Sequence, residues 1–185
     1  MKKYELTEET FTVSKKTLYR IRAVRDFGSV KTGDLGGYIE KEENLSHFDD
    51  AWVSGNAKVS GNANIFDNAW VFGNAWVFDN AEVSGNGKVS GNANIFDNAR
   101  ISGNAEIFNT RHFCTQGPIG SRNGFVTFYR TKDNTVEVKC GCFLGSLQEF
   151  VNQVEKTHKG NKYEKEYKLA AELAKVCIRL EGESK

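Results

Sequence analysis

The residues best suited to chemistry lie in a short glycine-rich loop in the last third of the chain. Gly120, Ser121, Arg122 and Asn123 stand directly before a segment with the composition of a strand. Free backbone N–H groups, a hydroxyl and a guanidinium can together bind a phosphate or a carboxylate. The loop lacks both the Gly-Lys-Ser/Thr of a P-loop and a glycine-rich strand-to-helix turn, so a purely structural tight loop is the alternative.

Three further side chains of the same region could add positive charge to this loop. Arg130 and Lys132 border a predicted turn between two strands, and His158 lies near the end of a predicted helix. With the loop they form the candidate binding site for a small anionic molecule, such as a nucleotide. No catalytic residue is assigned and no cofactor is expected.

One histidine and three of the cysteines are candidate metal ligands, so their spacing can be compared with that of known zinc sites. His112 and Cys114 are two residues apart, as are Cys140 and Cys142, so each pair could project from one face of a strand. Zinc accepts three cysteines and one histidine, but paired thiols in zinc sites are usually separated by at least two residues. Buried free thiols are therefore the favoured interpretation, and a metal site or a redox pair is the alternative.

The middle of the chain consists of six-residue repeats that must position any such site. Ten hexads of the form Ala-x-(Val/Ile)-x-x-Asn run without insertion from Ala51 to Thr110. In an extended segment Ala and Val or Ile face the same side, while the following residues turn the chain, helped by the tolerance of Asn for left-handed backbone. Three hexads, or 18 residues, would close one triangular coil.

The hexads resemble the hexapeptide repeat of left-handed parallel β-helices, which many acyltransferases contain. The segment Asp34–Ile39, followed by Asn44-Leu45-Ser46 and then Ala51-Trp52-Val53, resembles a narrower group. This group comprises uncharacterised hexapeptide-repeat proteins of phages, prophages and bacteria, often labelled as transferases. The resemblance implies a left-handed β-helix of about four coils. It also suggests a role inside a bacterial host, either sequestering a nucleotide signal or blocking a defence protein.

The alternative function is an acyl-CoA-dependent transferase. Enzymes that this repeat resembles generally need a histidine base and a loop that leaves the coils to shape an acceptor pocket. Here the hexads are uninterrupted and contain no histidine, so only His47 before them and His112 after them are candidate bases. This departure favours a binding protein over an enzyme, and a purely structural or protein-interaction module is a third interpretation.

Stacking of residues 18 apart predicts columns of outward-facing aromatic side chains. Contiguous apolar patches on a soluble surface usually mark association, and the β-helix enzymes that this repeat resembles are commonly trimers. We therefore expect a homo-oligomer, with a trimer favoured. Aromatic ladders within the solenoid and ring stacking with a ligand are the alternatives. The predicted interface consists of Trp52, Trp70, Trp76, Phe66, Phe72, Phe78 and Phe96.

Two segments flank the repeats and complete the predicted organisation. Residues 1–32 should form a β-hairpin cap and residues 33–110 the β-helix. Residues 111–185 should form a small α+β domain with a β-hairpin and two helices, after an irregular loop over 111–123. The second helix is expected over about 163–180. The predicted fold class is therefore mainly β.

The charge of the chain is segregated although its sum is only +1. Residues 1–44 carry +1, residues 45–110 carry −4 and residues 111–185 carry +4. The small sum argues against a strong nucleic-acid partner, and no apolar run approaches the ~20 residues that cross a bilayer. The N-terminus lacks the apolar stretch of a signal peptide. We expect a cytoplasmic protein without a membrane partner, whose anionic ligand binds the basic C-terminal domain.

Overall fold

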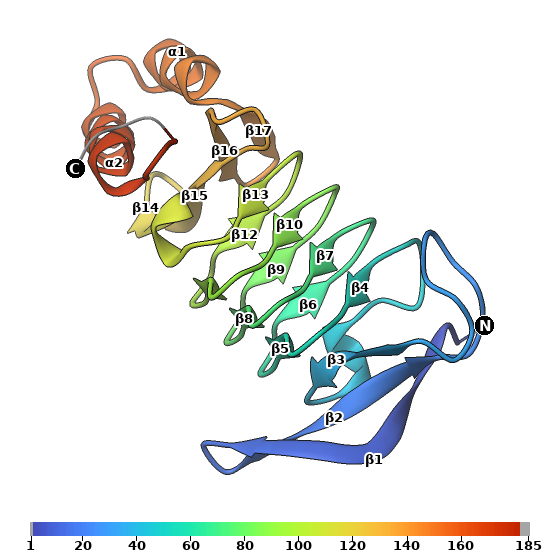
Figure 1. The fold of residues 1–185 in the computed structure, drawn as a ribbon. Helices are drawn as coiled ribbons and strands as arrows, with labels where there is room; N and C mark the ends of the chain where they lie inside the picture. Colours follow the sequence, from blue (N-terminus) through green and yellow to red (C-terminus); the bar gives the residue numbers. More distant parts are fainter. Residues whose placement is uncertain (1, 182–185) are drawn as a thin grey trace.

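The computed structural model describes residues 2–181 and has three parts in chain order, which Figure 1 shows. An N-terminal β-hairpin lies at one end of a stack of short parallel strands, and two helices lie at the other end. The predicted fold class is confirmed, because the protein is mainly β, with a solenoid of about four coils followed by a small α+β domain.

Each of the ten hexads contributes one two-residue strand to the solenoid. The strands are β4 (Trp52–Val53), β5 (Lys58–Val59), β6 (Asn64–Ile65), β7 (Trp70–Val71), β8 (Trp76–Val77), β9 (Glu82–Val83), β10 (Lys88–Val89), β11 (Asn94–Ile95), β12 (Arg100–Ile101) and β13 (Glu106–Ile107). Residues 18 apart pair in parallel, so that Lys88 lies between Trp70 and Glu106. The strands form three stacks, β4-β7-β10-β13, β5-β8-β11 and β6-β9-β12, one for each side of the coil.

The interior of the solenoid is filled by the first and third positions of the hexad. Every alanine at position one and every valine or isoleucine at position three is at most 1 % exposed. Burying a Val or Ile side chain stabilises a fold by roughly 1.5–3 kcal/mol. Ten such side chains along one axis therefore form a continuous core.

The corners of the coils differ in one respect from the prediction. Left-handed backbone occurs at position five of the hexad, as at Gly55 (φ 64°) and Asp67 (φ 58°), and not at the asparagine of position six. Glycine adopts this region without a steric cost, and aspartate tolerates it. The asparagines instead hydrogen-bond along the stack, as Asn62 does with Asn80 at 3.1 Å.

The N-terminal segment covers the first coil with a hairpin, as predicted. Strands β1 (Tyr4–Val13) and β2 (Lys16–Ala23) are antiparallel, and β2 pairs with β3 (Leu35–Ile39). Because β3 is parallel to β5, the hairpin extends one side of the solenoid into a six-stranded sheet. A single helical turn, η1 (Glu42–Asn44), leads into the first hexads.

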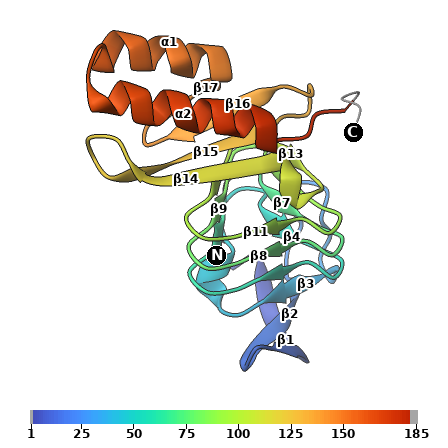
Figure 2. The ribbon, with the colours of Figure 1, turned by 90° about the vertical axis from the view of Figure 1, so that its left-hand side faces the viewer.

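The C-terminal domain contains a four-stranded antiparallel sheet and two helices. Its elements are β14 (Phe113–Ile119), β15 (Gly124–Arg130), β16 (Val136–Cys140), β17 (Phe143–Ser146), α1 (Leu147–His158) and α2 (Lys162–Cys177), preceded by the turn η2 (Thr110–His112). Figure 2 shows this sheet between the last coil and the helices. Neighbouring residues of β15 pack on opposite faces of this sheet. Tyr129 packs in the solenoid core, and Phe128 packs in the core beneath the helices.

The prediction of an irregular loop over residues 111–123 is wrong, because most of this segment is strand β14. Gly117 and Pro118 resemble turn residues, but β14 is the edge strand of its sheet and carries a bulge between Gln116 and Ile119. At such a place the missing N–H of proline breaks no ladder hydrogen bond. The predicted hairpin is therefore the centre of a larger sheet.

Both helices lie close to their predicted places. The capping box of α1 is present: the Ser146 hydroxyl accepts from the Glu149 N–H at 3.2 Å, and the Ser146 N–H donates to the Glu149 carboxylate at 2.8 Å. Helix α2 begins at Lys162 after the cap residue Asn161, and it ends at Cys177, earlier than predicted.

Candidate functional site

A cleft of about 640 Å³ lies between the solenoid and the C-terminal domain. One wall is a corner and an outer face of the solenoid. The other wall is built from the β14–β15 and β16–β17 turns of the C-terminal sheet and from both helices. The lining residues are Asn80, Glu82, Asn98, Arg100, Ser121, Arg122, Gly124, Phe125, Cys140, Gly141, Cys142, Thr157, His158 and Tyr167.

The glycine-rich loop is the β14–β15 turn, and contacts with α2 hold it in place. The Gly120 N–H donates to the Glu166 carboxylate at 2.7 Å. Gly120 has φ 72°, and a Cβ at this position would collide with the Tyr167 hydroxyl, so only glycine fits. The Gly120 amide therefore positions the loop and does not face a ligand, which corrects its assignment as a binding group.

Three of the predicted ligand groups lie in the same cleft. Ser121 and Arg122 are exposed in the turn, and His158 is half-buried at the C-terminal end of α1. The His158 ring lies 5.6 Å from the ring of Tyr167. Asn123, at the end of the turn with φ 47°, is exposed but is not among the lining residues.

The solenoid wall supplies residues that the sequence does not predict for the site. Arg100 forms an ion pair with Glu82, one coil below, with 3.3 Å between Nε and Oε2. The Arg100 N–H donates to the Thr127 hydroxyl at 3.0 Å, so the β12–β15 junction sits beside the cleft. The 18-residue spacing places Glu82 and Arg100 in one column, but no sequence signal says which side of the coil the C-terminal domain covers.

The β16–β17 turn brings two thiols to the cleft. Cys140 is half-buried and Cys142 is exposed, and neither is in a disulfide. Burial raises the pKa of the Cys140 thiol, and the nearby Tyr167 hydroxyl partly offsets this. Burial also raises the pKa of Tyr167 itself, so its hydroxyl is protonated at neutral pH and can donate a hydrogen bond.

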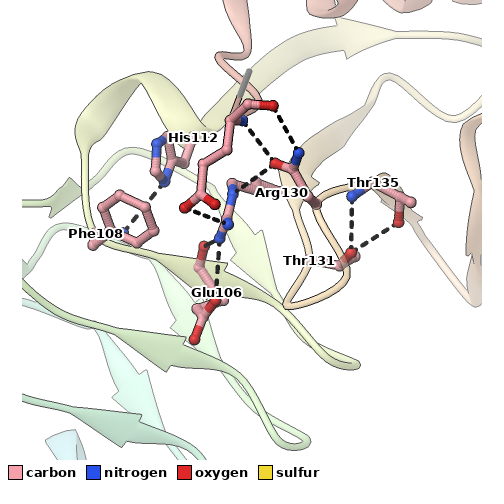
Figure 3. A network of polar contacts seen from close by, with 8 residues as sticks. Glu106, Phe108, His112, Arg130, Thr131 and Thr135 are labelled. Atoms are coloured by element: carbon pink, nitrogen blue, oxygen red, sulfur yellow. Dashed lines mark hydrogen bonds and ion pairs between the residues drawn. The ribbon is translucent and has the colours of Figure 1, made fainter. Parts of the chain in front are cut away.

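Arg130 and Lys132 do not line the cleft, and Arg130 has a different role. Its side chain is 3 % exposed, and its guanidinium forms ion pairs with Glu106 at 3.2 Å and with Glu181 at 3.0 Å. Figure 3 shows the contact with Glu106. It also lies 4.9 Å from the centre of the Phe108 ring. A buried arginine occupied in this way ties the last coil to the C-terminal segment, which corrects its assignment as a ligand group.

The candidate metal ligands are dispersed over two places. His112 lies beside the Phe108 ring at 4.2 Å, and Cys114 is buried on β14, whereas Cys140 and Cys142 line the cleft. Among residues 2–181, no group of three or more His, Cys, Asp and Glu side chains is placed to hold a metal ion. The four residues therefore do not form one ligand set.

The two histidines considered as catalytic bases are packed against other rings and lie outside the cleft. His47 stacks on Tyr4 with ring centres 4.2 Å apart, and burial lowers its pKa. Burial and the nearby Arg130 guanidinium lower the pKa of His112. Both imidazoles are therefore neutral at neutral pH.

The predicted interface residues differ in their exposure. Trp52 is 3 % exposed because Tyr4 and Phe27 cover it, which removes it from any interface. Trp70 and Trp76 lie along the solenoid and donate their indole N–H groups to serine hydroxyls one coil below, at 3.0 and 3.2 Å. Trp70 and Phe72 are each 36 % exposed, while the remaining members, Phe66, Trp76, Phe78 and Phe96, are half-buried.

Comparisons with known proteins do not place the chain in a family. A scan against protein-family models finds no match for the chain, and a search of curated proteins finds no match either. No helix within residues 2–181 combines the length and the apolar character that a membrane crossing requires.

Proposed function

We propose that the chain is a non-enzymatic binding protein that sequesters a small anionic ligand, such as a nucleotide, in the cleft beside the β14–β15 turn. One observation carries this proposal. Ser121 and Arg122 are adjacent, whereas His158 and Arg100 lie far from them in the sequence, and all four residues line the same cleft.

The charges of the cleft favour an anion. Arg100 is paired with Glu82, whereas Arg122 has no ion-pair partner among residues 2–181. An unpaired guanidinium in the wall of a cleft can bind a phosphate or a carboxylate through two parallel hydrogen bonds. The Ser121 hydroxyl beside it offers a further donor.

The remaining lining favours a ligand that carries a ring as well as a charge. Phe125 and Tyr167 present aromatic side chains, and Asn80 and Asn98 present carboxamides that both donate and accept hydrogen bonds. The volume of about 640 Å³ is within the range of small-molecule sites. A nucleotide combines a flat ring, hydrogen-bonding edges and a phosphate, so this class fits all three features.

Calorimetric titration with adenosine 5′-monophosphate, inorganic phosphate and adenosine tests the proposal. The nucleotide should bind more tightly than either of its parts. Arg122→Ala should weaken its binding about tenfold, since a hydrogen bond to a charged group contributes roughly 1.5–3 kcal/mol. Arg111→Ala is the matched control, because Arg111 is an exposed arginine outside the cleft. Equal binding by both variants, or no binding of any probe to the unmodified chain, would contradict the proposal.

The biological role that we attach to this binding follows from the resemblance to phage and prophage hexapeptide-repeat proteins. In that setting the ligand would be a nucleotide signal in the cytoplasm of a bacterial host, and blocking of a host defence protein is the alternative role. An acyl-CoA-dependent transferase remains the alternative activity. Release of free thiol from acetyl-CoA in the presence of acceptors would favour it over pure binding.

We also propose that the protein is a homo-oligomer, with a trimer favoured, through the solenoid face that carries Trp70 and Phe72. Their rings lie 5.9 Å apart and both are partly exposed, so they form one small apolar patch. Native mass spectrometry at micromolar concentration should give a multiple of the 20.7 kDa chain mass. A monomer under these conditions would contradict this part of the proposal.

A further inference from the structure

The cleft contains a pair of thiols that the proposed binding function does not use. Cys140 pairs with Phe143 across the β16–β17 hairpin, so Gly141 and Cys142 are the two central residues of the turn. Gly141 has φ 57° and occupies the first central position, where tight hairpin turns of the II′ type need glycine. Cys140 and Cys142 are both free, and both line the cleft.

The turn keeps the two thiols within reach of one another. Residues two apart in a chain are separated by at most about 7 Å between Cα atoms. A disulfide usually joins Cα atoms about 4.4–6.8 Å apart, so a small adjustment of the turn is enough to close one. A disulfide in so tight a turn is more readily reduced than a structural disulfide, as is typical of bridges that form and break in use.

The two thiols differ in access, which sets the order of their reactions. Cys142 is exposed, so a small molecule can reach its sulfur directly. Cys140 is half-buried beside Tyr167, and burial raises the pKa of its thiol. Cys142 is therefore the thiol that a reagent meets first, and Cys140 is the one placed to react second.

We propose that Cys140 and Cys142 form a redox-active dithiol in the wall of the cleft, which undergoes exchange with low-molecular-weight disulfides such as glutathione disulfide. The Cys142 thiolate attacks one sulfur of the small disulfide, forms a mixed disulfide, and releases the first small thiolate. The Cys140 thiolate then attacks the Cys142 sulfur and releases the second. The two protons lost by the protein thiols pass through water to the leaving thiolates. The protein thiols are oxidised to one disulfide, and the small disulfide is reduced to two thiols.

The other cysteines supply an internal control for this chemistry. Cys114 and Cys177 line a different cleft, near the start of β14, and neither is part of a turn. A chain with Cys114→Ser and Cys177→Ser keeps the proposed pair and removes the remaining thiols. It should therefore behave as the unmodified chain does at residues 140 and 142.

The test uses the full chain without ligand, equilibrated in mixtures of glutathione and glutathione disulfide. Free thiols are then alkylated in acid, and the disulfides are assigned by peptide mapping with mass spectrometry. The unmodified chain should contain a Cys140–Cys142 disulfide in the more oxidising mixtures. Cys140→Ser should instead stop at a mixed disulfide with glutathione on Cys142.

Two results would overturn the inference. One is an unmodified chain that carries glutathione on Cys142 and no Cys140–Cys142 disulfide, because the second step would then be missing. The other is an unmodified chain in which both thiols stay reduced in every mixture. Both results are read from the unmodified chain, so the test does not depend on the folding of a variant or on the binding of a nucleotide.

Discussion

The solenoid and the C-terminal domain are built in opposite ways. In the solenoid one rule, a small and a branched residue facing inward in each hexad, is repeated ten times with the same 18-residue register. In the C-terminal domain each contact occurs once, such as the Gly120–Glu166 hydrogen bond and the Arg130 ion pairs. The repeated part forms a regular surface, and the cleft appears where the irregular part is placed against it. Function in such a chain is therefore expected at the junction.

The largest effect should come from breaking the rule of the solenoid at one inward position. Ile95 is fully buried, so Ile95→Asp places an unpaired carboxylate in the core and should lower the free energy of unfolding by at least about 4 kcal/mol. The neighbouring Asn94 is exposed, and Asn94→Asp should change it by less than about 0.5 kcal/mol. Urea unfolding followed by circular dichroism measures both. A similar decrease in the free energy of unfolding in both variants would contradict the difference between inward and outward positions of the hexad.

The next effect concerns the contact that ties the two regions together. Arg130→Met removes a buried guanidinium from Glu106 and Glu181, and it should lower the free energy of unfolding by about 2–3 kcal/mol. Both carboxylates are partly exposed and can be rehydrated, so the full cost of a broken buried pair is not expected. The exposed Lys132 lies two residues away, and Lys132→Met is the control with little expected effect. If the denaturant midpoints of the two variants coincide, the contacts of Arg130 do not stabilise the junction between the last coil and the C-terminal segment.

A smaller effect should follow from filling the space at the loop of the cleft. Gly120→Ala forces a Cβ against Tyr167 at a left-handed position and should cost about 1–2 kcal/mol, or roughly 2–8 °C in Tm for a chain of this size. A Cβ added at Gly124 would have no neighbouring atom within 4 Å, and its φ is not positive, so Gly124→Ala should be close to neutral. Scanning calorimetry compares them. An unchanged melting temperature in Gly120→Ala would mean that the loop does not rest on α2.

The smallest effect is a pH dependence at the junction. Burial and Arg130 lower the pKa of His112, while Glu106 and Glu181 act in the opposite direction. The unfolded chain therefore binds the proton more readily, and the free energy of unfolding should fall as the pH drops below the ordinary histidine pKa of about 6.5. Urea midpoints between pH 7.5 and pH 5.5 should fall less steeply in His112→Gln than in the unmodified chain. If the urea midpoints of both proteins fall equally with pH, His112 is not the source of the pH dependence.

The structure of the solenoid can be predicted from the sequence in more detail than that of the C-terminal domain, for physical reasons. The inward alternation in the hexads specifies the coils, the stacking and the core, because a single local pattern repeats and each residue has one role. The capping box at Ser146 likewise specifies the start of α1 from four neighbouring residues. The loop at 120–123 could be recognised as a candidate site from its residue types alone.

Features that depend on contacts between distant segments could not be predicted in the same way. Arg130 has the residue type of a ligand group, and only the packing of Glu106 and Glu181 around it reveals its structural role. Trp52 occupies an outward position of its hexad, yet Tyr4 and Phe27 cover it. Arg100 belongs to the cleft because of the side on which the C-terminal domain lies, which no local pattern specifies.

The most direct test of the central claim asks whether a nucleotide occupies the junction between the two regions. Alkylation of the free thiols by iodoacetamide is followed residue by residue, with and without adenosine 5′-monophosphate at ten times its Kd. Alkylation of Cys142, which lines the cleft, should slow about tenfold with the nucleotide. Cys177 lies in a different cleft and should react at an unchanged rate. Equal rates at Cys142 with and without the nucleotide, or equal slowing at both cysteines, would contradict the account.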